Sequence, residues 1–348
     1  MLTGTAPASG PVPAPVRKLR PVSADGTVLY AEVYGPEGAP AVVLSHGWTC
    51  STLFWSHQLR VLAGDHRVVV YDQRGHGRSR TVGPAGCTTD ALADDLEAVL
   101  AATLEPDEKA VLVGHSMGGM TLMAAAGRPG LRRHAAAALL CSTGSSRLVA
   151  ESLLLPLRAG RLRDLLTTVI LGARAPLGPV TPVSRALLKY GTMGPGAAPD
   201  RVAECARIVH ACPRPIRVAW AHVLEELEIG HTVRELRVPT AIVAGAADRL
   251  TPPVHAHALA AELPECLGVE VLPGVGHMSP VEAPEAVTAR IRALAETYLP
   301  GLPGQPRTAG AAKTGPASTT EPPGAPEPPD AAVPTSTTEP TRTTEEVV

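Results

Sequence analysis

The sequence predicts an α/β fold in which a mostly parallel sheet is flanked by helices. Nearly continuous apolar runs occur at residues 41–45, 67–71, 110–114 and 137–142. Runs of this kind are typical of parallel strands that are buried on both faces. Helix-like segments alternate with them, and strand–helix–strand repetition predicts right-handed crossover connections within one sheet.

The clearest helix of this alternation covers residues 90–103. Leu92, Leu96 and Val99 recur there at helical spacing, and Thr89 is the expected N-cap. The other expected elements are strands at residues 28–34, 240–244 and 269–272, a helix at 253–263, and a final helix that begins near Pro284.

The alternation stops between residues 144 and 234, where helices are expected around residues 150–168 and 201–228 and no strand is expected. The simplest interpretation is one α/β domain, residues 17–143 and 235–300, interrupted by a helical insertion. A series of leucines in the insertion is expected to form mainly a helix packing face, and only secondarily a pocket lining. These leucines are Leu153, Leu154, Leu155, Leu157, Leu162, Leu165 and Leu166.

The two ends of the chain have a different composition. Residues 301–348 contain 10 of the 36 prolines and 10 threonines, and their only leucine is Leu302. Such a segment cannot bury enough apolar surface to offset its chain entropy, so a disordered tail is expected. Residues 1–16 are rich in Pro, Ala and Gly and are also expected to be disordered.

Charge and composition exclude several classes of protein. A formal net charge of −2 provides no basic field for nucleic acid or anionic lipid, and 3% aromatic residues argue against base stacking. The sequence contains no run of about eighteen apolar residues, so no membrane span is predicted. No export signal is present, so a cytoplasmic protein with six reduced cysteines is expected. Neither a C-x-x-C nor an H-E-x-x-H motif occurs in the sequence, so no metal site is predicted.

The sequence GHSMG at residues 114–118 matches the motif G-x-S-x-G, and it directly follows an apolar strand. Glycines at both flanks allow a sharp strand-to-helix turn, on which Ser116 would expose its hydroxyl at a helix N-terminus. The five-letter pattern is weak by itself in a chain rich in Gly and Ser. Its position after a buried strand makes Ser116 the candidate nucleophile.

A serine nucleophile needs a histidine base. His46, His76 and His277 all lie in Gly-containing loops after strands, where the active sites of α/β sheets form. Only His277 follows a candidate acid in the order Ser, Asp, His that this type of fold uses. His115 neighbours Ser116 and points to the opposite face, so a packing or hydrogen-bonding role is expected for it.

Asp248 is the candidate acid, because it follows the strand at residues 240–244. A helix cap or turn is the alternative role for an aspartate at this position. Asp72 precedes the serine in an Arg-rich loop, and the loop after residues 137–142 contains no carboxylate. Asp248 is therefore the best candidate for the carboxylate that orients the histidine.

Over residues 20–299 the chain resembles the α/β-hydrolase family. The resemblance rests on five motifs in the family's order, which are SHGW at residues 45–48, DQRGHGRS at 72–79, GHSMG at 114–118, GAADRLTP at 245–252 and GVGHMSP at 274–280. It implies an oxyanion hole formed by the backbone N–H groups of Trp48 and Met117. It also implies structural roles for Asp72 and Arg74.

The resemblance further implies that residues 144–234 form a helical cap over the substrate pocket. Epoxide hydrolases and haloalkane dehalogenases of this fold use an aspartate nucleophile, so Ser116 argues against both activities. No metal or organic cofactor is implied. The expected partner is a small-molecule substrate.

The expected reaction is hydrolysis of an ester-like bond through an acyl-enzyme, with Ser116, His277 and Asp248 as catalytic residues. A small, apolar acyl or alkyl group is favoured as substrate. Three alternatives remain open, because one fold supports many reactions. These are cofactor-free perhydrolysis of the haloperoxidase type, thioester or C–C bond hydrolysis, and non-catalytic ligand binding on the same fold.

Overall fold

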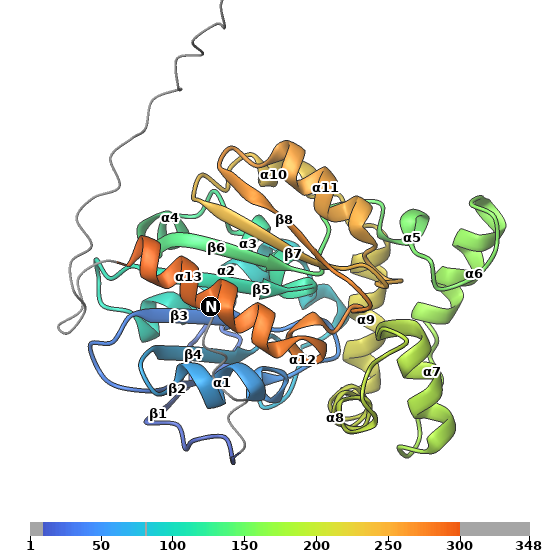
Figure 1. The fold of residues 1–348 in the computed structure, drawn as a ribbon, viewed down its shortest axis with the longest axis horizontal. Helices are drawn as coiled ribbons and strands as arrows, with labels where there is room; N and C mark the ends of the chain where they lie inside the picture. The colour runs from blue at the N-terminus through green and yellow to red at the C-terminus, as the bar shows by residue number, and fades with distance from the viewer. Residues whose placement is uncertain (1–9, 81, 300–348) are drawn as a thin grey trace, which may run out of the picture. The chain divides into compact units, whose positions relative to one another are not determined.

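The computed structural model describes residues 10–80 and 82–299, and Figure 1 shows their arrangement. The disorder expected for residues 1–16 and for the tail at 301–348 falls largely on segments outside the described residues. Residues 10–16 are described, and there the Val16 amide donates to the Val33 carbonyl at 2.8 Å and Val12 packs against the core. Between residues 10 and 299, Thr81 apart, no helix is both long enough and apolar enough to cross a membrane. All six cysteines are described, and all are free thiols.

An eight-stranded sheet forms the centre of the fold, with the order β1-β2-β4-β3-β5-β6-β7-β8. Strands β3 to β8 pair in parallel, whereas β2 is antiparallel to both β1 and β4. The predicted α/β fold with a mostly parallel sheet is therefore confirmed. The strands are β1 Arg17–Leu19, β2 Tyr30–Tyr34, β3 Ala41–Ser45, β4 Arg67–Asp72, β5 Ala110–His115, β6 Ala135–Cys141, β7 Thr240–Gly245 and β8 Cys266–Leu272.

Helices cover both faces of the sheet, so neighbouring residues of one strand enter different cores. In β3, Val43 belongs to the cluster that contains Leu96 of α2, whereas Leu44 belongs to the cluster that contains Ile291 of α13. Burial on both faces explains why the central strands are continuously apolar. Outside the insertion, the α-helices are α1 Ser56–Leu62, α2 Thr89–Thr103, α3 Met117–Ala124, α4 Pro129–His134, α11 Pro253–Glu262, α12 Ser279–Glu282 and α13 Pro284–Tyr298.

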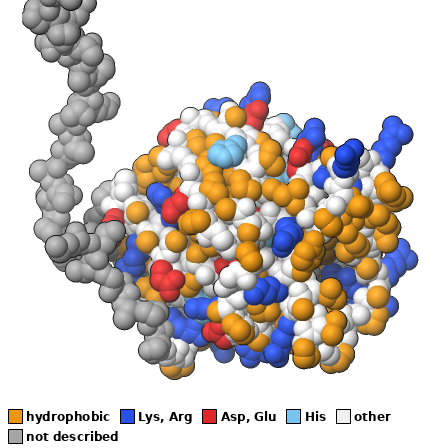
Figure 2. Space-filling view, turned by 45° about the vertical axis from the view of Figure 1, so that its right-hand side comes forward, with side chains coloured by type: hydrophobic (Ala, Val, Ile, Leu, Met, Phe, Trp, Pro, Cys, Tyr) orange, Lys and Arg blue, Asp and Glu red, His pale blue; other side chains and the backbone are white. Residues whose placement is uncertain are grey.

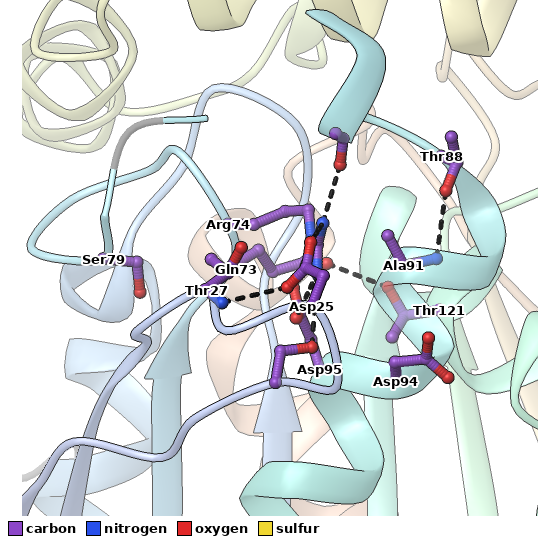
Figure 3. Close-up of polar contacts among 12 residues, drawn as sticks. Asp25, Thr27, Gln73, Arg74, Ser79, Thr88, Ala91, Asp94, Asp95 and Thr121 are labelled. Carbon is purple, nitrogen blue, oxygen red and sulfur yellow. Dashed lines mark hydrogen bonds and ion pairs between the residues drawn. The ribbon is translucent and has the colours of Figure 1, made fainter. Parts of the chain in front are cut away.

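Several expected boundaries differ from the observed ones by a few residues. The N-cap of α2 is Thr88 and not Thr89, because the Thr88 backbone is extended and its hydroxyl accepts a hydrogen bond from the Ala91 amide at 3.1 Å (Figure 3). Strand β2 begins at Tyr30 instead of residue 28, and β8 begins at Cys266 instead of residue 269. The three-residue edge strand β1 and the helix α1 were not predicted.

The insertion differs more from expectation, because prolines divide its helices. Instead of one helix at residues 150–168, α5 (Leu148–Glu151) and α6 (Arg161–Leu171) flank a segment that contains Pro156. Instead of one helix at 201–228, α8 (Pro199–His210) and α9 (Arg214–Glu225) are separated at Pro213. The unpredicted helices are α7 (Pro182–Thr192) and α10 (Gly230–Val233), and α7 begins at a capping box of Thr181 and Ser184.

A buried ion pair joins the loop after β4 to α2. Arg74 is completely buried, and its guanidinium donates two hydrogen bonds to Asp95, at 2.7 and 2.6 Å (Figure 3). It also donates to Asp25 at 3.0 Å and to the Gly86 carbonyl at 2.7 Å. Arg74 therefore connects three segments of the chain, in line with the structural role expected for it.

The turn from β5 into α3 packs directly against β3. A Cβ atom at Gly118 would lie 2.1 Å from the Ser45 carbonyl oxygen, and one at Gly114 would lie 2.5 Å from the backbone of Gly118. No side chain fits at such distances. The two glycines that flank Ser116 are thus required by close packing of backbone on backbone.

Asp95→Asn tests the buried ion pair. Removal of one charge leaves the buried guanidinium of Arg74 with only the half-exposed carboxylate of Asp25 as its counter-charge. The free energy of unfolding should therefore fall by up to about 3–5 kcal/mol. Glu235→Gln is the matched control, because the Glu235–Arg132 pair (2.8 Å) is solvent-exposed and such pairs contribute about 0–1 kcal/mol. Urea unfolding of the three proteins measures the difference. Equal losses for both variants would contradict a structural role of the buried pair.

Gly118→Ala tests the packing of the turn. The added methyl group must push β3 and α3 apart, and such overpacking should cost about 1–3 kcal/mol or more. Gly83→Ala is the control, since a Cβ there meets no atom within 4 Å. Thermal unfolding of both variants measures the effect. A melting temperature of Gly118→Ala equal to that of Gly83→Ala would show that the turn tolerates a side chain.

Candidate active site

Ser116 occupies the turn between the end of β5 and the first residue of α3. Its backbone has φ 51° and ψ −119°, a combination that few non-glycine residues adopt. Hydrogen bonds hold it there, since its amide donates to the Cys141 carbonyl at 3.0 Å and its carbonyl accepts from the Thr143 hydroxyl at 2.7 Å. The Ser116 side chain lines a cavity above the sheet.

Asp248 and His277 meet at the same edge of the sheet, beyond the ends of β7 and β8. The carboxyl ends of parallel strands lie together, which brings these two loops close to Ser116. His277 Nδ1 lies 2.9 Å from Asp248 Oδ2. A carboxylate only accepts hydrogen bonds, so Nδ1 carries the proton and Nε2 is left as the free acceptor.

The structure therefore places Ser116, Asp248 and His277 at the same edge of the sheet. His277 lines the same cavity as Ser116. The hydrogen bond expected between Ser116 and His277 is not formed within residues 10–80 and 82–299. Nucleophile–base hydrogen bonds are often long in unliganded enzymes and tighten when substrate binds.

Thr251 is a site residue that sequence reasoning missed. Its hydroxyl donates to Asp248 Oδ2 at 2.9 Å and lies 3.2 Å from His277 Nδ1. The amides of Leu250 and Thr251 donate to Asp248 Oδ1 at 2.8 and 3.0 Å. Both oxygens of the buried carboxylate are thus satisfied. The signal in the sequence is the spacing D-x-x-T at residues 248–251, which is typical of an aspartate that caps its own turn.

Glu282 is a second missed residue, and it holds the loop that carries His277. Its carboxylate accepts hydrogen bonds from the Gly276 and Met278 amides, both at 3.1 Å, and from the Gly194 amide at 2.7 Å. Burial raises its pKa above the usual value. The residues on both sides of His277 are therefore tied to one side chain.

Two backbone N–H groups near Ser116 in the fold have no hydrogen-bond partner among the described residues. The amides of Trp48 and Met117 donate to no other residue between 10 and 299, position 81 left aside. Met117 is the first residue of α3, where N–H groups have no intrahelical acceptor and the helix dipole is positive. Trp48 lines the cavity, and its indole donates to the Arg217 carbonyl at 3.1 Å.

The other histidines considered as bases have structural contacts. His46 donates to the Gly47 carbonyl and accepts from the Gln73 amide, and burial lowers its pKa to about 4. Burial likewise lowers the pKa of His76 to about 3. His115 donates to the His277 carbonyl at 2.8 Å, and burial holds its pKa well below the usual value. All three remain neutral near pH 7.

The cavity has a volume of about 480 Å³, and most of its lining is apolar. The insertion contributes much of this lining, including Leu148, Leu154, Leu155, Ile170, Leu177 and Leu187. Among the residues that the structure describes, no group of three or more His, Cys, Asp or Glu side chains is placed to hold a metal ion.

Comparisons with known proteins find relatives that are hydrolases and haloperoxidases. A putative carbamate hydrolase RutD from Variovorax paradoxus (strain S110) is 44% identical over 93 residues, which are 26% of this chain and 34% of that protein. The chain thus spans about a third of the length of this relative. A non-heme haloperoxidase from Rhodococcus erythropolis is 29% identical over 264 residues, which are 73% of this chain and 91% of that protein.

Solved structures show the same fold. A thermophilic esterase from Thermogutta terrifontis superposes with a TM-score of 0.64 and 25% identity, covering 81% of this chain and 99% of that one. Residues 40–284 match the alpha/beta hydrolase fold, which is well over half of the chain. The chain therefore belongs to the α/β-hydrolase fold family.

Proposed function

We propose that the protein is a serine hydrolase that cleaves an ester-like bond of a small apolar substrate through an acyl-enzyme. The observation that carries this proposal is the 2.9 Å contact between the buried Asp248 and His277, which lines the same cavity as Ser116. An imidazole oriented by a carboxylate, in a cavity that a serine hydroxyl also lines, is the arrangement that acyl transfer requires.

Ser116 attacks the substrate carbonyl while His277 Nε2 accepts its proton. Asp248 keeps the proton on Nδ1 and stabilises the imidazolium that forms. The Trp48 and Met117 amides donate to the developing oxyanion, and each such donor contributes roughly 3 kcal/mol to transition-state stabilisation. His277 then protonates the leaving alkoxide. Water, activated by the same histidine, releases the acyl group.

The substrate preference follows from the lining of the cavity. A volume of about 480 Å³ is sufficient for a small ligand, and most of the lining is apolar. Two charged residues of the insertion, Arg217 and Glu225, also line the cavity, and the Arg217 guanidinium donates to the Ala173 and Ala175 carbonyls. Residues 144–234 act as a cap over the cavity, and residues 17–143 and 235–300 form the α/β core beneath it. An apolar acyl or alkyl group fits this environment better than a charged one.

Perhydrolysis is the second candidate, and similarity to a non-heme haloperoxidase over 73% of the chain favours it. The acyl-enzyme would form in the same way. Hydrogen peroxide instead of water would then attack the Ser116 ester, which yields a peracid and the free serine. An assay that supplies peroxide and detects peracid distinguishes the two reactions.

Ser116→Ala should abolish turnover of p-nitrophenyl esters, with a loss of at least about 10³-fold in kcat. Asp248→Asn should lose about 10⁴-fold, because the amide no longer enforces the productive tautomer. Ser152→Ala is the matched control, since Ser152 also lines the cavity but its hydroxyl donates to the Arg249 carbonyl. Activity of Ser116→Ala close to that of Ser152→Ala would refute the assignment of the nucleophile.

Thr251→Val should lower kcat by roughly 10- to 100-fold with little change in KM, because a hydrogen bond to a charged group contributes about 1.5–3 kcal/mol. Thr251→Ser keeps the hydroxyl and should restore most of the rate. Thr168→Val is the control, as Thr168 also lines the cavity. A change in KM alone, or no rescue by serine, would show that Thr251 does not position Asp248.

A further inference from the structure

The helix α6 presents its apolar side to solvent. Its exposed hydrophobic residues follow the spacing i, i+3, i+4, i+7, i+8, which forms one continuous stripe. The inward side carries Arg163 and Thr167, which are buried. This orientation is the reverse of that in an ordinary surface helix. The exposed residues of α6 are Leu162, Leu165, Leu166, Val169 and Ile170.

The neighbouring elements of the insertion extend the same surface. In α7, Val183, Leu187 and Tyr190 are exposed along one side of the helix, and Leu177 is exposed in the connection between α6 and α7. We call these residues and the exposed stripe of α6 the apolar face. Figure 1 places α6 and α7 at the outer end of the molecule, and Figure 2 shows hydrophobic side chains gathered on that side.

The apolar face is continuous with the mouth of the cavity. Ile170, Leu177, Leu187 and Tyr190 are exposed to solvent and also line the cavity that contains Ser116. Exposed apolar patches of this extent are rare on monomeric proteins and mark sites of interaction. An apolar molecule that leaves the face can therefore enter the cavity without crossing polar surface.

The charge around the apolar face is predominantly positive, so the insertion provides locally the basic field for anionic lipid that the net charge of the whole chain does not. Residues 153–190 contain six basic residues and one acidic residue, Asp164, so their net charge is +5, whereas the whole chain has −2. Among the described residues, the four exposed guanidinium groups of this segment form no ion pair with a carboxylate. They belong to Arg158, Arg161, Arg174 and Arg185.

We propose that the apolar face docks on an anionic lipid surface, with its leucines among the acyl chains and the guanidinium groups of Arg158, Arg161 and Arg174 at the phosphate groups. Amphipathic helices with basic flanks bind membrane interfaces in this way. A second copy of the chain fits less well, because an isologous contact would place like charges opposite each other. Docking goes beyond the proposed hydrolysis and does not depend on Ser116.

The experiment measures co-sedimentation of the full chain with vesicles of equimolar phosphatidylcholine and phosphatidylglycerol, and with vesicles of phosphatidylcholine alone. The wild type should bind the anionic vesicles more tightly, and added salt should weaken binding. Leu162→Gln with Leu165→Gln should reduce the affinity by roughly tenfold or more. Arg158→Gln with Arg161→Gln should remove most of the preference for phosphatidylglycerol.

Leu267→Gln is the matched control, because Leu267 is also exposed but lies on β8. Its binding should equal that of the wild type. The Leu162 and Leu165 side chains do not line the cavity, so hydrolysis of a water-soluble p-nitrophenyl ester should be unchanged in the double variant, which also shows that it is folded. Ser116→Ala should bind vesicles normally, which separates this test from that of the catalytic proposal.

Three results would overturn the proposal. The first is no binding of the wild type to anionic vesicles, and the second is equal binding by the wild type and the double leucine variant. The third is a dimer, detected by light scattering, that the leucine substitutions dissociate while vesicle binding persists. That outcome would assign the apolar face to a second copy of the chain.

Discussion

The backbone conformation of Ser116 is the constraint on which the candidate site depends. Its φ of 51° and ψ of −119° cost about 1–3 kcal/mol, and the structure offsets this cost locally. The Cys141 carbonyl and the Thr143 hydroxyl bond to its two peptide groups, and Gly118 allows β3 to approach to backbone contact. The hydroxyl is therefore positioned by the sheet itself. Within the described residues, the same turn also leaves the Met117 amide without an acceptor.

The loop of His277 is positioned differently, by polar contacts from several parts of the chain. Glu282 bonds to the amides on both sides of it, and the Thr192 carbonyl accepts from the His277 amide at 2.8 Å. Thr192 is the last residue of α7, and Glu282 also holds the Gly194 amide just beyond it. The end of an insertion helix and the loop of the candidate base thus form one hydrogen-bonded unit. A displacement of α7 would break hydrogen bonds at His277.

Structural elements could be predicted from the sequence where a local pattern is compatible with only one kind of structure. Continuous apolar runs predicted the buried strands, because residues such as Val43 and Leu44 enter cores on opposite faces of the sheet. The order of Ser116, Asp248 and His277 predicted residues that the fold brings to one edge, and their catalytic roles remain predictions. The support from Glu282 had no comparable signal, because its contact with Gly194 spans 88 residues and exists only in the tertiary structure.

In the insertion, the helical spacing of apolar residues predicts the helices but not their orientation. The leucine spacing of α6 indicates an amphipathic helix, but it does not say which side the protein covers, and the expected packing face was wrong for most of these leucines. Arg163 turns inward because its guanidinium bonds to the Ala150 carbonyl, whereas the buried hydroxyl of Thr167 finds no partner among the described residues. Each exposed leucine forgoes part of the roughly 1.5–3 kcal/mol that complete burial of its side chain would contribute. A lipid surface would supply that burial at the mouth of the cavity.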